Sequence, residues 1–487
     1  MDAAETLFAR ANLLRERGNA EQAKLAYMDV LARSPGHFGA LNNLGALLYE
    51  MGYRSAARTA YAEAVARHPQ NPAGHVNLAN ALREAGDPAL ARAHCEKALA
   101  LAPHYAAAHQ AYAGILAELG DEEAAARHRR LGFENHPVMT LPYRGRGKPI
   151  SLLLLVSAVG GNIPIRHLLD DHVFRTSVIY ADYWKAGKPL PPHDLVFNTV
   201  GDADLCGSAV AAAADLLAGD DAPVVNAPAA VLRSGRAANA ARLAGLAGVR
   251  VPRTVNLPRA ALCGAQGAAL LAQAGFEFPL LLRTPGFHTG RNFLRVGTAG
   301  ELGTAAESLP GRELTAIEYL DARGSDGCAR KYRAMFVDGK IHPLHLAVSD
   351  DWKVHYFTSA MAESAAFRAE EERFLADMPG VIGARAVAAL EHIRAALGLD
   401  YAGIDFALNA EREILLFEAN ATMVVNPPDP DKCWDYRRQA VARIHRAVHA
   451  MLVERAAANL SPATPGFSPN ASTISRANET CDGTLIH

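Results

Sequence analysis

The sequence predicts an α-helical solenoid followed by a region of mixed helices and strands. Three observations lead to this fold class: a 34-residue repeat within residues 1–137, strands that alternate with helices from about residue 150, and two consecutive alternating strands at 399–420. A fixed period of this length indicates stacked helix pairs. Alternation of strands with helices indicates a sheet covered by helices.

The composition is that of an ordinary globular protein. The chain has 487 residues, of which 50% are hydrophobic and 21% charged, and its formal net charge is −2. Its length corresponds to roughly three domains. The near-neutral charge gives no sign of a nucleic-acid partner. We also expect no membrane partner, because no apolar run reaches the roughly 18 residues that span a bilayer.

The cysteines are scattered and form no Cys-x-x-Cys pair. This suggests neither a disulfide framework nor a zinc knuckle, and it fits a reducing compartment. The N-terminus lacks the charged and then apolar pattern of a signal peptide. We therefore expect a cytoplasmic protein. The six cysteines are Cys95, Cys206, Cys263, Cys328, Cys433 and Cys481.

Glycine, proline and alanine recur at 34-residue intervals in the first part of the chain. The glycines are Gly18, Gly52, Gly86 and Gly120, the prolines are Pro35, Pro69, Pro103 and Pro137, and the alanines are Ala23, Ala57, Ala91 and Ala125. This pattern resembles the tetratricopeptide repeat (TPR), whose period is 34 residues. The resemblance implies four repeats over residues 1–140, each with a helix, a glycine turn, a second helix and a proline stop.

Stacked repeats of this family expose a concave groove that often holds a peptide through asparagines on the first helices. The candidates here are Asn12, Asn43, Asn77 and Asn80. A peptide or protein is therefore one expected partner. Two alternatives stay open: the asparagines contact solvent or packed neighbours, or the groove mediates self-association.

Residues 150–232 predict a small α/β domain that follows a Pro- and Gly-containing linker at 142–149. Ser151–Val156 is apolar after its first residue, as in a buried parallel strand. Gly160-Gly161-Asn162 leads into a helical pattern, and residues 194–198 and 223–226 form two further expected strands. The linker's Gly-Arg-Gly-Lys is not a phosphate loop, because prolines occupy the positions of the required Gly and Ser or Thr.

The next segment combines arginines with a glycine loop. A helix containing Arg233, Arg236 and Arg242 is expected to end near Gly248. The strand that ends at Arg283 is followed by the loop 286–292 and a strand at 293–296. Such a hairpin can fold over phosphates, which backbone N–H groups and arginine would contact. Glycine hairpins are common, so this segment alone leaves the function open.

A second hairpin follows an acidic strand at 315–321. Asp338-Gly339 lies between two apolar runs, 332–337 and 340–345, and this dipeptide is typical of a tight β-hairpin turn. Arg333 shares a face with apolar neighbours, so we expect an anionic partner for it. On a regular strand, residues three apart face opposite sides, so we do not expect His342 and His345 to form a zinc pair.

The segment Leu399–Asn420 predicts two half-buried strands joined by a turn. Ile404, Phe406 and Leu408 alternate with Asp405 and Ala407, and Ile414 and Leu416 share a face with Glu418 and Asn420. A four-residue loop at 410–413 places Asp405 opposite Glu418. The two carboxylates would repel unless a hard cation such as Mg²⁺ lies between them. The alternative is a solvated face with ordinary surface acids.

Seven features occur in the order found in the ATP-grasp superfamily, which the chain resembles over residues 151–455. They are an α/β domain, GVRVPRT, FPLLLRTPG, IEYLD, RAMFVDGK, GIDFAL and LFEAN. The superfamily includes D-alanine–D-alanine ligase and glutathione synthetase. The resemblance implies an N-terminal α/β pre-ATP-grasp domain at 150–232 and an α+β ATP-grasp fold at 233–457. We expect the polar tail 461–487 to be disordered.

The resemblance also implies a role for individual residues. Arg236 and Arg283 stand where phosphate-binding lysines or arginines are usual, and arginine in both lysine positions leaves the detailed contacts open. Glu318-Tyr319-Leu320 matches the hinge that receives adenine, with Glu318 or Asp321 on the adenine amino group or ribose. Arg333 matches the catalytic arginine beside the γ-phosphate, and Lys331 and His288 could contact phosphates. The implied Mg²⁺ ligands are Asp405, Glu418 and Asn420.

The function implied by these matches is an ATP- and Mg²⁺-dependent carboxylate–amine ligase that acts through an acyl phosphate. Its acid and amine are unknown, and the repeats could hold a peptide or protein that the ligase region modifies. A homodimer is common among relatives and is a further expected partner state. Two alternatives remain: a nucleotide-binding scaffold or sensor without turnover, and a kinase that transfers phosphate without forming an amide.

Overall fold

The computed structural model describes residues 3–185, 187–284, 292–354, 359–429 and 431–460. The chain divides into two compact units, each described by itself. The first contains the described residues up to Val159 together with Asp171–Pro192, and the second contains Gly160–Asp170 and His193–Asn459. The predicted glycine loop 286–292 lies outside the described residues except for Asn292, and His288 and the tail 461–487 lie wholly outside them. Among the described helices, none is both long and apolar enough to cross a membrane.

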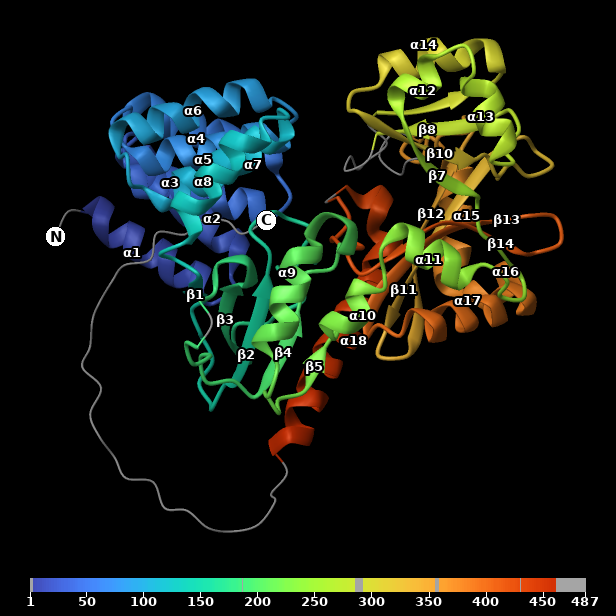
Figure 1. Ribbon diagram of the computed structural model, residues 1–487. Helices are drawn as coiled ribbons and strands as arrows, with labels where there is room; N and C mark the ends of the chain where they lie inside the picture. Colours follow the sequence, from blue (N-terminus) through green and yellow to red (C-terminus); the bar gives the residue numbers. More distant parts are fainter. Residues whose placement is uncertain (1–2, 186, 285–291, 355–358, 430, 461–487) are drawn as a thin grey trace. The chain divides into compact units, whose positions relative to one another are not determined.

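Eight consecutive helices open the first unit, as the 34-residue repeat predicted (Figure 1). They form four hairpins, and each hairpin turns at a glycine with a positive φ between 75° and 89°, a backbone conformation that glycine adopts without steric cost. The helices are α1 Ala3–Glu16, α2 Ala20–Arg33, α3 Phe38–Glu50, α4 Arg54–Arg67, α5 Pro72–Glu84, α6 Pro88–Leu101, α7 Ala106–Glu118 and α8 Glu122–Phe133.

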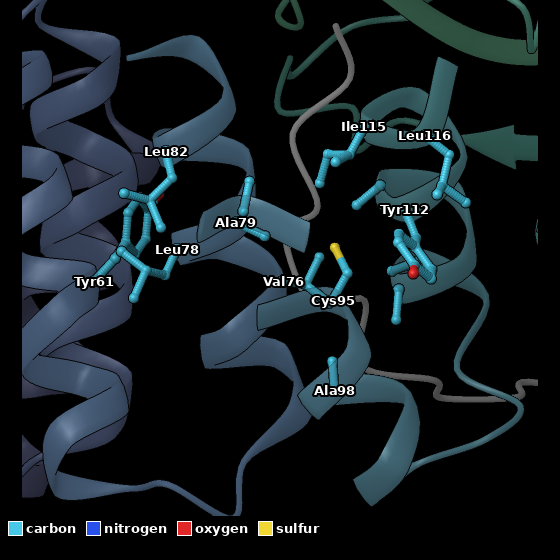
Figure 2. Packing of buried hydrophobic residues seen from close by; sticks show 14 of the residues in the cluster. Tyr61, Val76, Leu78, Ala79, Leu82, Cys95, Ala98, Tyr112, Ile115 and Leu116 are labelled. Atoms are coloured by element: carbon cyan, nitrogen blue, oxygen red, sulfur yellow. The ribbon is translucent and has the colours of Figure 1, made fainter. Parts of the chain in front are cut away.

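Small residues let these helices approach one another closely. The four periodic alanines of the second helices are fully buried. On α3, a Cβ added at Gly45 would lie 2.7 Å from the ring of Tyr61, so this contact requires glycine. Figure 2 shows how Tyr61, Leu82 and Tyr112 from three different helices contribute to one core. Burial in that core raises the pKa of the Cys95 thiol to about 12.

Two pairs of histidines recur 34 residues apart in the third and fourth hairpins. The Nδ1 atoms of His75 and His94 are 3.0 Å apart, and those of His109 and His128 are 2.8 Å apart. The Nε2 atoms of His75 and His109 contact the carbonyl oxygens of Pro69 and Pro103. Because a carbonyl only accepts, each of these Nε2 atoms carries the proton, and in the neutral pair the partner's Nδ1–H donates to the remaining Nδ1.

The histidine pairs should make the first unit sensitive to acid. Burial, followed by the neighbouring histidine, lowers the pKa of His94 and of His128 below the ordinary value of about 6.5. The unfolded chain therefore binds more protons below that pH, and stability should fall as the pH drops from about 7 through the folded-state pKa values. Circular dichroism melts of the full chain at several pH values would measure this dependence. His94→Gln should weaken it and the exposed His104→Gln should not; equal slopes for both variants and the wild type would contradict the assignment.

Three strands complete the first unit. β1 Val138–Thr140 pairs antiparallel with β3 Phe174–Tyr180, and β3 runs parallel to β2 Ile150–Val156, whose last five residues are fully buried as predicted. β3 was not predicted, although Phe174, Thr176 and Val178 alternate with more exposed residues. A short 3₁₀ turn, Ala181–Tyr183, follows β3.

The prediction of a helix after Gly160-Gly161-Asn162 is wrong. The backbone makes a single turn there, in which Leu168 and Leu169 donate to the carbonyl of Ile165. Asp170 and Asp171 come directly after this turn. Negative charge at the C-terminal end of a helix opposes its dipole, so these residues disfavour an extension.

The second unit begins with a parallel strand pair and three helices. β4 Leu195–Asn198 and β5 Val224–Val225 confirm the predicted strands. Between and after them lie α9 Ala203–Leu216, α10 Pro228–Leu232 and α11 Arg236–Leu243. The single helix expected to contain Arg233, Arg236 and Arg242 is therefore two helices, because the chain breaks at Gly235, which precedes α11 with extended ψ.

A four-stranded antiparallel sheet has the order β7-β10-β8-β9. Its strands are β7 Thr254–Pro258, β8 Leu280–Arg283, β9 Phe293–Val296 and β10 Glu313–Glu318. Leu262, Leu271 and Leu302 come from three helices and pack against this sheet in one core. These helices are α12 Arg259–Cys263, α13 Gly267–Gln273 and α14 Leu302–Ser308, with a 3₁₀ turn at Ala299–Glu301.

A five-stranded sheet has the order β12-β11-β13-β14-β6 and is antiparallel except for β14 and β6. Asp338 and Gly339 join β11 and β12 with φ of 47° and 73°, as the Asp-Gly signal predicted. Its strands are β6 Val249–Arg250, β11 Ala329–Val337, β12 Lys340–Ser349, β13 Tyr401–Leu408 and β14 Ile414–Asn420.

Helices pack against this sheet. The ring of Phe374 on a helix packs edge-on against Tyr332, which stacks on Phe406. The last helix buries Ile444 and Val448 completely. The helices of this region are α15 Ala365–Ala376, α16 Met378–Ile382, α17 Ala384–Leu397 and α18 Asp435–Leu460, with a 3₁₀ turn at Lys432–Trp434.

Candidate functional site

One row of side chains crosses four neighbouring strands of the five-stranded sheet. His345 of β12 pairs with Arg333 of β11, Arg333 pairs with Asp405 of β13, and Asp405 pairs with Glu418 of β14. We call these four residues the charged row. The prediction that Asp405 lies opposite Glu418 is confirmed.

The pairing arises differently from the way the sequence suggested. Phe406 pairs with Leu416, and its neighbour Asp405 pairs with Glu418, so Phe417 is an extra residue in β14. The loop 409–413 is one residue longer than expected. The β-bulge at Phe417 offsets this extra residue, so Asp405 still lies opposite Glu418. Because Phe406 and Asp405 point to opposite faces, their partners do too, and the expectation that Leu416 and Glu418 share a face is wrong.

Asp405 is the most buried charge of the row, with 3% of its surface exposed. Arg333 donates to both of its carboxylate oxygens, at 2.5 and 2.7 Å, and Lys331 Nζ lies 3.4 Å from Oδ2. Burial would raise the pKa of Asp405, but Arg333 and Lys331 outweigh it and hold that pKa well below its usual value. The predicted anionic partner of Arg333 is therefore Asp405. The strand is also buried on both faces from Tyr401 to Ala407, rather than on one face as predicted.

Glu418 also has a guanidinium partner. Arg236 Nη2 of α11 lies 3.0 Å from Glu418 Oε1, and Asn420 Nδ2 donates to the same oxygen at 2.9 Å. The Asn420 amide oxygen accepts from the backbone N–H and hydroxyl of Thr422. The three residues fit a hard cation in donor chemistry and in register. Each carboxylate is balanced by an arginine in this structure, and the Asn420 amide would have to rotate to offer its oxygen beside Glu418.

A pocket opens beside the outer end of the charged row. Arg236, Glu418 and Asn420 line it, so three of the predicted site residues meet there. Arg283 lies in the same electrostatic environment: burial and Arg236 lower its pKa, whereas Glu418 and Asp202 oppose this shift. The full lining is Gly201–Asp204, Ser234, Arg236, Asn239, Ala240, Val251, Pro252, Thr254, Ile317 and Leu416–Asn420.

The predicted hinge residues have partners of their own. The Glu318 carboxylate accepts from Arg250 Nη2 at 2.9 Å and from the backbone N–H of Arg253 at 3.0 Å. Asp321 forms a forked ion pair with Arg323. Burial would raise the pKa of Glu318, but the hydrogen bonds from the Arg253 backbone and the Arg250 side chain outweigh it and lower that pKa. In contrast to Ile317 beside it, Glu318 does not line the pocket.

The remaining two hinge residues contribute packing. The guanidinium of Arg295 lies 5.0 Å from the ring centroid of Tyr319. Leu320 is buried against Ala407 and Leu415 of the five-stranded sheet. Leu320 thus ties the end of β10 to the strands that hold Asp405 and Glu418.

Sequence reasoning missed a buried network next to the charged row. Glu371 of α15 is fully buried, accepts from Tyr436 Oη at 2.5 Å and lies 3.2 Å from Arg437 Nε. Arg437 and Arg333, together with the dominant effect of burial, keep the pKa of His345 well below its usual value. The run Ala-Glu-Glu-Glu-Arg around Glu371 is typical of a solvated helix face, so the sequence had no signal for this burial.

Three of the four asparagines predicted for the concave groove contact other asparagines within the first unit. Asn43 Nδ2 donates to Asn12 Oδ1 at 3.0 Å, and Asn77 Nδ2 donates to Asn42 Oδ1 at 2.5 Å. Asn12 Oδ1 also accepts from the Tyr27 hydroxyl. Asn77 and Asn80 are 7% exposed. These amides connect neighbouring repeats, which is the packed-neighbour alternative.

Comparison with known families gives a match in this first unit. The tetratricopeptide repeat model matches residues 8–72 and 47–106. These residues are tetratricopeptide repeats.

Solved structures similar to part of this chain include two of MamA and one of YrrB. "MamA 41-end from Desulfovibrio magneticus RS-1" is 24% identical, covering 26% of this chain and 71% of that chain, with a TM-score of 0.24. "MamA RS-1 ArsTM double mutant" is 23% identical over 27% and 74% of the chains, with a TM-score of 0.25. "YrrB: a TPR protein with an unusual peptide-binding site" is 21% identical over 27% and 68%, with a TM-score of 0.25. The search of curated proteins found no match.

The ion pair between Arg333 and Asp405 should be a large, coupled contribution to the stability of the second unit. Arg333→Met or Asp405→Asn should each lower the free energy of unfolding by about 3–5 kcal/mol, because each leaves a buried charge without its partner. The double variant Arg333→Met/Asp405→Asn should lose less than the sum. Urea denaturation would measure the cycle, with Arg385→Met at an exposed pair with Glu413 as a control that costs about 0–1 kcal/mol. Additive losses would contradict the coupling.

Proposed function

We propose that the protein is an ATP- and Mg²⁺-dependent ligase that joins a carboxylate to an amine, as its resemblance to the ATP-grasp superfamily implies. The observation that carries this proposal is the charged row beside the pocket. Arg333 comes from a strand that is distant in sequence from the hairpin of Asp405 and Glu418, and the three residues are adjacent in register. Arg236, from helix α11, donates to the Glu418 carboxylate. The mechanism of this superfamily would require phosphate-binding arginines and metal-binding carboxylates to lie next to one another, as these side chains do.

The chemistry explains why such a site needs both charges. A carboxylate resists attack by an amine, so one carboxylate oxygen first attacks the γ-phosphorus of ATP, and ADP leaves. The amine then adds to the acyl phosphate, loses a proton, and inorganic phosphate departs with the former carboxylate oxygen. The pocket would take a phosphorylated and therefore highly charged group, for which arginine offers two parallel donors.

Each residue has a defined task in this proposal. Arg236 and Arg283 would bind the phosphate oxygens, and Arg333 would stabilise the charge that develops on the transferring group. Asp405, Glu418 and Asn420 would hold Mg²⁺, which supplies charge neutralisation along the phosphates when bound. Leu320 would hold the hinge against the sheet, with Ile317 beside it in the pocket wall.

The repeats would serve recognition of the substrate. We infer that a peptide or protein binds the first unit and presents a carboxylate or amine to the ligase region. Tetratricopeptide repeats expose a continuous surface along their stack, which suits an extended chain. Because Asn12, Asn43 and Asn77 already contact neighbouring amides, that surface would offer other side chains to a bound peptide.

Glu418→Gln should abolish ADP formation while the chain stays folded. The change removes one negative charge from the proposed cation site and keeps the shape of the side chain. ATP consumption with Mg²⁺, screened over amino acids and cell-extract peptides with mass spectrometry of the products, would measure it. Glu413→Gln is the matched control, because Glu413 lies beside the same hairpin and contacts Arg385 and Asn409 outside the pocket.

The products of that screen separate the three candidate functions. ADP and phosphate with a product lighter by one water than its summed substrates would establish a ligase. ADP with a phosphorylated product would establish a kinase. ATP binding without turnover would favour the scaffold or sensor, and undiminished turnover by Glu418→Gln would overturn the site assignment.

Removing the repeats should separate recognition from chemistry. A chain that begins at about residue 145 should lose activity on a peptide or protein substrate and retain basal ATP turnover. Steady-state rates with peptide and with small amines would be compared for the full and shortened chains. Equal peptide activity in both would show that the repeats do not bring this substrate to the site.

A further inference from the structure

Both acids that the proposed function assigns to a cation are already neutralised by the protein's own side chains. Asp405 receives a two-pronged contact from Arg333 and a second cation, Lys331, at 3.4 Å. Glu418 receives Arg236 at 3.0 Å. The sequence suggested a hard cation as the means of relieving the repulsion between the two carboxylates. In the structure, guanidinium groups relieve it.

Arg333 and Arg236 differ in how exposed their ion pairs are to solvent. Arg333 is part of a central strand, and its partner Asp405 is buried. Arg236 stands at the first position of the short helix α11, directly after Gly235, and its side chain is 35% exposed. Glu418 is 29% exposed and lines the pocket. The outer pair is therefore accessible to a ligand, whereas the inner pair is shielded.

We propose that Arg236 acts as a built-in counter-ion of Glu418 that keeps the cation site closed until a polyanion draws its guanidinium away. The inference rests on the proposed function, because it gives the triphosphate the role of that polyanion. A divalent cation alone meets carboxylates whose charge is already balanced, and its approach adds positive charge next to Arg236 and Arg333. A triphosphate offers the Arg236 guanidinium a new partner, and Glu418 then becomes available to the cation.

The exchange predicts opposite effects of one substitution on two ligands. Removal of the Arg236 guanidinium should strengthen cation binding, because Glu418 loses its competing partner. It should weaken nucleotide binding, because a phosphate ligand is lost. A residue with a purely structural role would not change the two affinities in opposite directions.

The test measures binding of Mn²⁺ to the full chain by calorimetry in the absence of nucleotide. Arg236→Gln should bind Mn²⁺ at least about tenfold more tightly than the wild type, within the usual range of coupling between sites. The same variant should bind a non-hydrolysable ATP analogue, without a divalent cation, about tenfold more weakly. Arg330→Gln is the matched control, because Arg330 is an ion-paired arginine of the same strand as Arg333 whose partners are Glu370 and Asp326. It should leave both affinities unchanged.

Two further variants locate the gained affinity and keep the test decisive. Adding Glu418→Gln to Arg236→Gln should abolish the tighter Mn²⁺ binding. Arg236→Met should change Mn²⁺ binding in the same direction as Arg236→Gln, and it serves in place of that variant should Arg236→Gln not fold. Unchanged or weaker Mn²⁺ binding in the folded arginine variant would overturn the inference. Failure of the wild type to bind the ATP analogue would overturn the proposed function, whereas the Mn²⁺ comparison would still decide whether Arg236 closes the site.

Discussion

The buried ion pair between Arg333 and Asp405 is the interaction on which the second unit depends. It joins β11 to β13 in the middle of a five-stranded sheet, where Asp405 has almost no contact with water. A carboxylate in such a place is stable only with a partner of opposite charge. Lys331, His345 and Glu418 are arranged around this pair, and Arg437 and Glu371 continue the network into the helices. The charged groups are thus part of the core as well as of the candidate site.

Much of this architecture could be read from the sequence because its signals are local. The 34-residue period places glycine at four turns and alanine at four helix contacts, and both follow from backbone sterics. Asp338-Gly339 fixes a hairpin for the same reason, since both residues adopt positive φ. The pairing of Asp405 with Glu418 was also predicted, but through a four-residue loop and a regular strand instead of the longer loop and the bulge that the structure has.

The parts that the sequence did not give depend on contacts between distant segments. Arg236 and Glu418 are 182 positions apart, and no periodicity connects them. The burial of Glu371 is decided by Tyr436 and Arg437 on another helix. The break at Gly235 and the single turn at Ile165 were missed because residues that favour helices continue through both positions. The backbone itself is not helical there. The extra residue Phe417 was hidden because the longer loop compensates for it in the count.

That compensation has a consequence for how the hairpin could change over time. The loop 409–413 is one residue longer than a regular ladder with this pairing would need, and the bulge at Phe417 adds one residue to β14. A deletion in the turn could be absorbed by straightening the strand, and the alignment of Asp405 with Glu418 would survive. Length variation at the exposed tip is in this way uncoupled from the position of the acids. The hairpin can therefore tolerate an insertion or deletion that would, in a regular ladder, rotate every side chain of β14 to the wrong face.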